Sequence, residues 1–516
     1  MNLRFFTYRY NFLSSKYWFG QVDSRPLSAF RIAFALLVLK DALYHLPLAG
    51  LFYSDAGLVP RGVLLNELAR PERFSLMDAL AHEWMAALFF FLWAGVALGL
   101  LVGYHTRLMS ILNFILVLSI HERNVYVLTG ADTAMRVMSF WGMFLPLGHY
   151  YSLDALRYHQ SARTAFAFPL RVIQLQIALV YLVTGLLKLS GETWQRGEAL
   201  FYVLQLESIQ WPPGAWLRQL APDWLLRILT WLTIITELSF MPLVFAPVLQ
   251  PMLRAAALFM GAALHLGIAM TMAIPDFSLV MMISYLLFFE PSWVQWIAER
   301  PLFKRLWMRI QRSAIIYRIA PRLDEHNARQ PEAIQQPDNS ACYRRYALAI
   351  FLVLLMAAVI WWNLIEIVSY TAPPAPPMPD LPQAVMWYSG LWQYWDLFAP
   401  LPLQIDGRIA IPGRFENGET FDLYAAHTSR PLWGPEIRWR KFEENINNYR
   451  YDALLREWGR YYCRLYNDIL ARPEGSRLAT LEIHFVYRRS YPPGGALSPL
   501  QDDLLWKHWC YEEYQY

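Results

Sequence analysis

The sequence predicts a mainly α-helical, polytopic transmembrane helix bundle of about nine spans, followed by a small C-terminal α+β domain outside the membrane. Hydrophobic residues make up 56% of the 516 residues. Charged residues make up only 17%, against about 25% in an ordinary soluble domain. Aromatic residues reach 16%, which suits the two interfaces of a bilayer. This composition excludes a disordered chain and a nucleic-acid-binding arm, so we expect a lipid bilayer as partner and no nucleic acid.

Nine stretches come close to the roughly 20 apolar residues that a membrane helix needs. They are 26–47, 83–103, 107–121, 133–149, 168–189, 224–247, 251–273, 277–295 and 346–370. The third, fourth and eighth stretches are short or carry polar residues, so their ends are the least defined. Prolines inside or between the spans, such as Pro146 and Pro242, mark kinks and turns.

Basic residues predict which ends of the spans face the cytoplasm. They concentrate in 1–25, and the linker 296–345 carries ten basic residues against five acidic ones. Cytoplasmic loops are rich in Lys and Arg, so we expect both segments in the cytoplasm, with the membrane domain over 1–295. The ninth span, 346–370, then places the C-terminal domain, 371–516, on the outer face of the cell (inner) membrane.

The C-terminal segment predicts a small α+β domain. A proline-rich stretch, TAPPAPPMPDLPQ, should be extended. IDGRIAIPGRFENGETFDLYAA predicts two short strands with a turn at 416–418. NINNYRYDALLREWGRYYCRLYNDILARP predicts one amphipathic helix ending before Pro473, and LATLEIHFVYRRSYPP predicts a strand. Cys463 and Cys510 both fall in this domain, where an oxidising exterior permits a disulfide; two separate buried thiols are the alternative.

Polar residues gather in the loops after spans 1, 3, 5 and 7, which share the outer face in this topology. These segments read LFYSDAGLVPRG, HERNVYVLTGADTAMR, TGLLKLSGETWQRGE and MAIPDFS. We therefore expect a pocket that is formed by these loops and capped by the C-terminal domain. The candidate binding residues on them are Asp55, Arg61, His121, Arg123 and Asn124.

Ionisable residues within or at the edge of the spans each need a reason, because a charge at the bilayer centre costs at least ~2.5–3.5 kcal/mol. They are Arg31, Lys40, Asp41, Arg136, Glu237 and His265. One interpretation is structural, with salt bridges between helices, for example between Glu237 and Arg31 or Arg136. The other is functional, a proton relay or a contact with a substrate. His265 and Arg136 of this set are catalytic candidates, together with Asp132, which directly precedes the fourth span.

Lys188 stands three residues before a glycine at the end of the fifth span. Its long side chain could snorkel to the membrane interface. Alternatively, its amine lies at the rim of an apolar cavity and serves as a base.

His121, Glu122 and Arg123 are adjacent at the end of the third span. Three neighbours on a helix point in different directions and cannot form one metal site by themselves. They could pin the following loop, or His121 could join Asp132 at a metal. That spacing is not diagnostic, so no metal site is predicted. The chain also lacks the HExxH, GxSxG, P-loop and CxxC motifs of common hydrolases, kinases and zinc knuckles.

Six segments follow one another in an order that resembles the HTTM domain, the membrane module shared by vitamin K-dependent γ-carboxylases and many bacterial proteins. They are RPLSAFRIAFALLVLKDAL, LFYSDAGLVPR, GYHTRL, HERNVYVLTGADTAMR, LPLGHYYSLDAL and TGLLKLSGETW. The resemblance covers roughly residues 22–295 and implies a bacterial-type HTTM membrane protein.

The resemblance also implies a site and a chemistry. HYYSLDAL is similar to the carboxylase's HYWS-type segment, and its first residue, His149, is a further candidate binding residue. GLLKLSGETW has Lys188 in the place of the carboxylase's base. In that chemistry the lysine deprotonates vitamin K hydroquinone, so a reduced quinone is the cofactor that the resemblance implies. Ala131 and Asp132 stand where the carboxylase has a histidine, and the C-terminal region is shorter than the carboxylase's.

These observations predict a multi-pass membrane protein with a quinone- or lipid-accessible site on its outer face. If the protein is an enzyme, we expect a carboxylase- or epoxidase-like reaction with a lysine base. The first alternative is a non-catalytic scaffold or maturation factor, with a secreted or membrane protein bound to the C-terminal domain. The second is a transporter, although the sequence shows no internal repeat.

Overall fold

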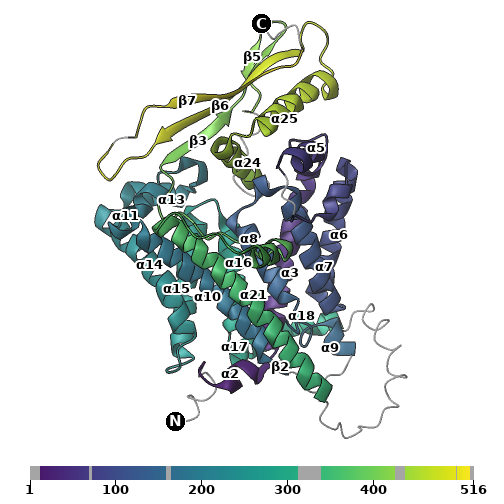
Figure 1. Ribbon diagram of the computed structural model, residues 1–516, viewed down its shortest axis with the longest axis vertical. Helices are drawn as coiled ribbons and strands as arrows, with labels where there is room; N and C mark the ends of the chain where they lie inside the picture. The colour runs from purple at the N-terminus through teal and green to yellow at the C-terminus, as the bar shows by residue number, and fades with distance from the viewer. Residues whose placement is uncertain are drawn as a thin grey trace.

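Figure 1 shows the computed structural model of the chain, which describes residues 12–68, 72–157, 164–311, 339–424, 436–495 and 497–511. Helices form a tall bundle, and a β-sheet with two helices forms a second layer at the top, where the chain ends. The N-terminal end lies at the opposite end of the bundle. Of the two segments expected in the cytoplasm, 1–11 and 312–338 lie outside the described residues.

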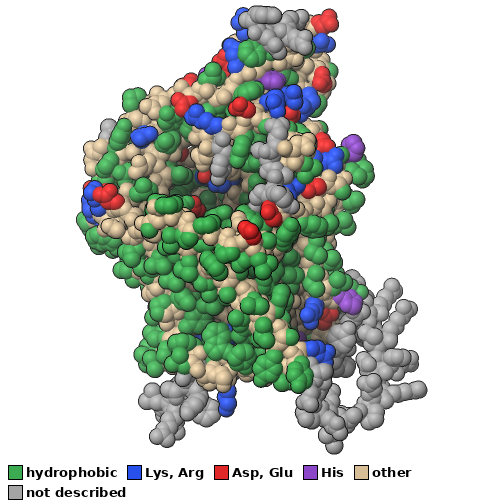
Figure 2. Space-filling model, in the orientation of Figure 1, with side chains coloured by type: hydrophobic (Ala, Val, Ile, Leu, Met, Phe, Trp, Pro, Cys, Tyr) green, Lys and Arg blue, Asp and Glu red, His purple; other side chains and the backbone are tan. Residues whose placement is uncertain are grey.

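Within the described ranges, six helices are long and apolar enough to cross a membrane. They are α3 (Arg25–His45, continued by η1, Leu46–Leu48, and α4, Ala49–Tyr53), α6 (Glu83–Val102), α10 (Ala167–Ser190), α14 (Asp223–Val244), α15 (Met252–Thr271) and α21 (Asn339–Thr371). Large apolar side chains on them, such as Phe91, Phe259 and Leu354, are exposed. Figure 2 shows hydrophobic side chains covering this part of the visible face, while most Lys, Arg, Asp and Glu lie above it. Such a surface suits contact with lipid, and the chain is a membrane protein.

The expectation of nine spans is not confirmed, because two of the predicted spans lack the length or the composition. α7 (Thr106–Arg123) carries three formal charges, on Arg107, Glu122 and Arg123. α8 (Gly130–Gly142) has 13 residues, so it is about 20 Å long against the roughly 30 Å of a bilayer core.

The predicted span 277–295 is a bent pair of helices. α16 (Pro275–Ser284), continued by η6 (Tyr285–Phe288), meets α17 (Pro291–Ala298) at an angle of 108°. Pro291 stands at the first position of α17, where a proline begins a new helix readily. If this pair counts as one span, the described residues hold seven candidates.

α8 occupies the interior of the bundle. Every residue from Ala131 to Gly142 is buried, and the helix packs against α7, α10 and α16. A helix covered by protein on all sides need not be apolar throughout, nor long enough to match the lipid. Its burial therefore explains why the sequence pattern of 133–149 differs from that of a lipid-facing span.

Shorter elements connect the long helices. They are α2 (Ser15–Phe19), β1 (Gln21–Asp23), α5 (Arg61–Val63), η2 (Leu64–Leu68), η3 (Leu76–Ala79), η4 (Val125–Val127), α9 (Leu153–Arg157), β2 (Thr164–Phe166), α11 (Glu192–Gln195), α12 (Ala199–Val203), η5 (Glu207–Ile209), α13 (Pro212–Leu220) and α18 (Pro301–Gln311). β1 and β2 pair antiparallel, which holds the start of α3 beside the start of α10.

The C-terminal region contains a five-stranded antiparallel sheet and several helices. They are α22 (Asp380–Tyr388), β3 (Ile405–Ala410), β4 (Pro412–Phe415), β5 (Thr420–Asp422), α24 (Glu436–Tyr449), α25 (Asp452–Cys463), η8 (Arg464–Ile469), β6 (Leu478–Arg489) and β7 (Gln501–Trp509). β6 is the central strand, with β3, β4 and β7 as its partners, and β5 pairs with β4. α24 packs on η4 of the membrane domain, so the region is seated on the top of the bundle.

Several details of this region differ from the sequence prediction. The segment 405–422 forms three strands instead of two. The expected single helix is broken at Arg450, whose φ of 45° is left-handed and cannot continue a helix. β7 was not expected, because its mixed apolar and charged sequence follows neither strand nor helix periodicity. α22 occupies the end of the proline-rich stretch, where Pro379 precedes the helix and Asp380 suits its first turn.

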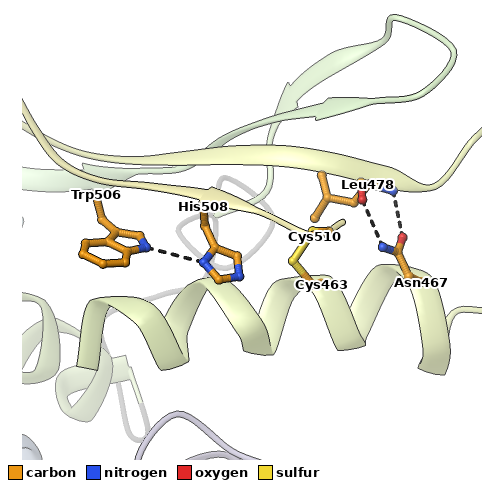
Figure 3. Close-up of a disulfide and its surroundings, with 6 residues drawn as sticks. All are labelled: Cys463, Asn467, Leu478, Trp506, His508 and Cys510. Carbon is orange, nitrogen blue, oxygen red and sulfur yellow. Dashed lines mark hydrogen bonds between the residues drawn. A yellow bond between two sulfur atoms is a disulfide. The ribbon is translucent and has the colours of Figure 1, made fainter. Parts of the chain in front are cut away.

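A disulfide joins Cys463, at the end of α25, to Cys510, just after β7 (Figure 3). Next to it, the Asn467 side chain exchanges two hydrogen bonds with the backbone of Leu478 in β6, at 3.0 and 2.7 Å. The helix is thus tied to both β6 and the end of β7. Cys342, at the start of α21, is a free and exposed thiol.

Candidate functional site

A cavity of about 470 Å³ lies between the membrane helices and the C-terminal region. Its membrane wall comes from α10, α14, α15 and α16, and its upper wall comes from α24 and residues 396–403. Most of the wall is apolar. Ionisable or polar side chains interrupt it on the membrane side, among them Lys188 with Glu237, His265 with Tyr181, and Asp276, which pairs with Lys40.

Lys188 and Glu237 form a buried ion pair between α10 and α14. The Lys188 Nζ lies 2.7 Å from Glu237 Oε1, and the two side chains are only 6% and 8% exposed. The lysine nitrogen also lies 5.1 Å from the centre of the Trp194 ring. Lys188 therefore does not snorkel to the interface; it stays inside the bundle and lines the cavity.

Gly185 makes this pair possible. It lies one turn before Lys188 on α10, and a Cβ there would come within 2.8 Å of the Leu238 side chain and 3.2 Å of Glu237 Cβ. The absence of a side chain lets α10 and α14 approach closely at this level, as small residues do between membrane helices. The pair thus depends on a contact between residues 49 positions apart.

His265, on α15, begins a short chain of hydrogen-bonded rings. Its Nε2 lies 2.6 Å from the Tyr181 hydroxyl, which lies 2.5 Å from the Tyr285 hydroxyl. The direction of donation along this chain depends on the histidine tautomer. If Tyr181 donates to Nε2, then Nδ1 carries the proton; if Nε2 donates, Nδ1 is an acceptor.

Two buried polar atoms at this cavity have no hydrogen-bond partner among the described residues. They are Glu237 Oε2 and His265 Nδ1. A buried polar atom without a partner costs about 1–3 kcal/mol, so such atoms are uncommon and call for an explanation. Here both residues line the same cavity, where a bound molecule could satisfy them.

Asp132, a catalytic candidate from sequence, lies in a different cluster. Arg438 of α24 reaches it with two hydrogen bonds, at 2.5 and 2.8 Å, and also contacts Asp41 at 3.2 Å. Asp132 further accepts from the backbone N–H of Thr129 at 2.6 Å and so caps α8. Burial alone would lower the pKa of Arg438, but the carboxylates of Asp132 and Asp41 outweigh it and raise that pKa. The geometry joins the C-terminal region to the bundle.

Arg136, another catalytic candidate, is engaged by the chain segment that follows α22. It donates to the carbonyl oxygens of Gly390 at 2.9 Å and Trp392 at 2.7 Å, and its guanidinium lies over the Trp392 ring. Glu237 pairs with neither Arg31 nor Arg136, the two partners considered from sequence, because Arg31 also binds backbone carbonyls.

The candidate binding residues on the loops bind other parts of the loops and do not line the cavity. Arg123 donates to the carbonyl oxygen of Val59, and Asn124 donates to that of Phe52, both at 3.0 Å. Arg61 binds both carboxylate oxygens of Asp55, at 3.0 and 2.7 Å. Burial acts to raise the pKa of Asp55, but the hydrogen bonds and charge of Arg61 outweigh it and lower that pKa.

Two histidines from the sequence prediction lie away from the cavity. His121 Nε2 lies 3.7 Å from Asp132 Oδ1, beside Arg438. His149 Nδ1 contacts the Ser24 hydroxyl at 2.9 Å, next to the start of α3. Because α3 and α10 start side by side and Lys188 lies near the end of α10, about 30 Å of helix separates it from His149.

Sequence reasoning missed Glu237 as the partner of Lys188, and it missed Tyr181, Tyr285 and Arg438 entirely. Glu237 carried a signal, since it is a carboxylate within an apolar span. Buried tyrosines in an aromatic-rich membrane chain carry none, and Arg438 is one of many basic residues in its region.

A helix bundle with a largely apolar cavity beneath its C-terminal region defines a class of polytopic membrane protein, and comparison with known families identifies it. The HTTM domain matches residues 19–293, which is more than half of the chain, so the protein belongs to the HTTM domain family. The chain is also similar to the uncharacterized protein YitO of Bacillus subtilis (strain 168). The two are 26% identical over 216 residues, which cover 39% of this chain and 67% of YitO. No solved structure matches the chain significantly.

Proposed function

We propose that the cavity beside Lys188 and His265 binds an apolar molecule that carries a hydroxyl group, and that the Lys188–Glu237 pair exchanges a proton with that hydroxyl. The observation that carries the proposal is the presence of two partnerless buried atoms, Glu237 Oε2 and His265 Nδ1, on the wall of one cavity. A hydroxyl can donate to the first atom. Either tautomer of His265 can hydrogen-bond a second polar atom of the same ligand.

A reduced quinone, the cofactor that the carboxylase resemblance implies, fits these residues. Its ring would face the apolar wall, for example Val180, Met281 and Phe277, and its hydroxyls would face Glu237 and His265. The volume of about 470 Å³ lies within the usual range for small-molecule sites. When bound, a reduced quinone supplies an acidic hydroxyl and a pair of electrons.

The protein's own residues would hold and move the proton. Glu237 can accept it at Oε2, while the adjacent Lys188 ammonium stabilises the negative charge left on the ligand oxygen. The apolar wall excludes water and so strengthens both interactions. In this scheme the base is the Lys188–Glu237 pair, held together at 2.7 Å, and not the lysine alone. A carboxylase- or epoxidase-like reaction is the enzymatic form of the proposal.

Substitutions of the pair test this function. Glu237→Gln keeps the shape of the side chain but removes the carboxylate that accepts the proton. We expect this variant to fail in any cellular assay in which the null mutant fails. The matched control is Glu290→Gln, which alters another buried ion pair, with Arg254, away from the cavity. Full function of Glu237→Gln would refute the role of the pair in proton transfer.

We further propose the orientation of the protein in the cell (inner) membrane. The N-terminal segment and the linker 296–345 would be cytoplasmic, and the sheet and its helices would lie outside. Two observations support this: the basic residues of both segments, and the position of α2, the first described helix, at the end of the bundle opposite the C-terminal region (Figure 1). α7 and α8 would complete nine crossings. The backbone N–H groups of His105 and Thr106, at the start of α7, donate to the Asp154 carboxylate. The chain that leaves α8 therefore returns to the end of the bundle where α7 begins.

A scaffold role for the C-terminal region is the second candidate, and it does not exclude the first. The five-stranded sheet lies above the bundle in Figure 1, where β3 contacts η5, and β7 carries exposed residues such as Leu504. An exposed edge strand can pair with an extended segment of a secreted or membrane protein. Pull-down of a specific partner by the wild-type chain, and its loss in Leu504→Glu, would support this role.

A further inference from the structure

A second cavity, of about 370 Å³, lies where α21 ends and the proline-rich segment begins. Its wall includes Trp362, Glu366 and Tyr370 of α21, Pro376 of the proline-rich segment, and Tyr394. None of its lining residues belongs to the wall of the cavity beside Lys188. It is therefore a separate place on the molecule, at the end of a membrane helix.

Glu366 lines this cavity, and only one of its two carboxylate oxygens accepts a hydrogen bond from the described residues. The residue is 4% exposed. Its Oε1 accepts a hydrogen bond from the backbone N–H of Trp395 at 2.6 Å, whereas its Oε2 has no partner among the described residues. No Lys, Arg or His nitrogen of the described ranges lies within ion-pair distance of this carboxylate. A buried carboxylate of this kind calls for a counter-ion or a proton.

A second negative charge lies near Glu366. Asp396, which follows Trp395, accepts a hydrogen bond from the Tyr370 hydroxyl at 3.0 Å. That bond orients Tyr370, which lines this cavity, while Asp396 itself lies on the wall of the cavity beside Lys188. A cation is the ligand that the Glu366 carboxylate favours.

The other walls are aromatic. The Trp362 and Tyr394 rings lie with their centres 5.6 Å apart and their planes tilted by 57°. The Trp362 indole N–H donates to the carbonyl oxygen of Gln393 at 2.6 Å, and its ring also packs on Trp387 at 5.2 Å. These contacts fix the indole on the cavity wall. Aromatic faces around a carboxylate suit organic ammonium groups, which combine charge with an apolar surface.

We propose that this cavity binds an organic ammonium group, primary or quaternary, with Glu366 as its counter-ion and Trp362 and Tyr394 as its aromatic wall. A small hydrated metal ion fits less well, because aromatic faces do not replace the oxygen ligands that it needs. The ammonium group could belong to the head group of a membrane lipid, since the cavity lies at the end of α21, or to a free amine in solution.

The experiment measures binding to the purified full-length protein in detergent. One arm adds choline, ethanolamine or 3,3-dimethylbutan-1-ol, the uncharged carbon analogue of choline, and follows the melting temperature. The other arm adds phosphatidylethanolamine, phosphatidylcholine or phosphatidylglycerol and counts retained lipids by native mass spectrometry. We expect ammonium compounds to bind, and the uncharged alcohol and phosphatidylglycerol to bind about 10-fold more weakly or not at all.

Glu366→Gln keeps the shape and removes the charge, so it should weaken ammonium binding about 10-fold. Glu192→Gln is the matched control, because Glu192 is an exposed carboxylate paired with Arg196, and it should bind as the wild type does. If Glu366→Gln fails to fold, Tyr394→Leu replaces it. Tyr394 is half exposed, and its removal should weaken ammonium binding while Glu366 remains.

Binding of ammonium lipids alone, or of free amines alone, supports the site and identifies its source of ammonium. Three results would overturn the proposal. The first is no binding in either arm. The second is equal binding of choline and 3,3-dimethylbutan-1-ol. The third is unchanged affinity in Glu366→Gln or, where that variant does not fold, in Tyr394→Leu.

Discussion

Gly185 decides how closely α10 and α14 approach at the Lys188–Glu237 pair. A methyl group there would meet Leu238 at 2.8 Å, closer than side-chain carbons normally come. Either the Leu238 side chain or the helix must move. Because the pair is made between the same two helices, displacement of α14 would lengthen the contact between the lysine and the carboxylate.

We therefore predict that Gly185→Ala destabilises the protein by about 1–3 kcal/mol, the usual cost of overpacking. Gly267→Ala is the control, since a Cβ at that position of α15 meets nothing within 4 Å. Thermal unfolding in detergent compares the two variants. Equal melting temperatures for Gly185→Ala and Gly267→Ala would show that the close approach of the helices is not needed.

At this scale the sequence predicts single residues better than it predicts their partners. Lys188 stands out because it is a lysine near the end of an apolar span, and His265 because it lies inside one. Their partners, Glu237 and Tyr181, lie 49 and 84 positions away along the chain. No local pattern connects such positions, since the contact arises only when the helices pack.

α24 is the element that joins the C-terminal region to the membrane domain through charge. Its Arg438 is buried between Asp132 of α8 and Asp41 of α3. Residues from three elements thus share one cluster. Without the guanidinium, two buried carboxylates would remain next to each other without a cation.

Arg438→Met should destabilise the seating of the C-terminal region by about 3–5 kcal/mol, as the loss of one partner from a buried pair does. Arg450→Met is the matched change at an exposed pair with Asp503, where the cost should be about 0–1 kcal/mol. Limited proteolysis of the full chain compares them. Equal resistance of the two variants would contradict the role of Arg438.

The disulfide ties α25 to the end of β7 and can be tested by counting thiols. Denatured, unreduced protein should react with a maleimide at one cysteine, Cys342, and reduced protein should react at three. Mass spectrometry gives the count directly. Three labelled cysteines without reduction would mean that Cys463 and Cys510 are separate thiols.

Whole elements were predictable where the pattern is simple, and less so where the surroundings decide. α6 is a continuous apolar stretch of 20 residues, and the sequence places it almost to the residue. α8 can be short and partly polar because other helices surround it, and the sequence alone does not show that it is surrounded. β7 has no clear alternation because all its residues are exposed or half-buried, and it is positioned by pairing with β6.

The molecule as a whole has a polar cap at one end of an apolar bundle (Figure 2). Cys342 lies at the start of α21, at the far end of this helix from the C-terminal region. In the proposed orientation it faces the cytoplasm. Since the other two cysteines are bridged, Cys342 reports the orientation by itself.

In intact cells, a membrane-permeant maleimide should label Cys342, whereas a membrane-impermeant one should not. The impermeant reagent should label it after the cells are opened. The protein carrying Cys342→Ser serves as the background control. Labelling of Cys342 by the impermeant reagent in intact cells would place the start of α21 outside and reverse the proposed topology.

The central claim is that the cavity beside Lys188 holds a hydroxyl-bearing apolar molecule through Glu237 Oε2 and His265 Nδ1. Mass spectrometry of the lipophilic molecules that co-purify with the protein tests it most directly, with wild type, Glu237→Gln and the control Glu290→Gln prepared side by side. We predict that one such molecule, for example a quinone in its reduced form, accompanies wild type and Glu290→Gln and is about 10-fold depleted in Glu237→Gln. The same lipophilic content in all three preparations would contradict the account.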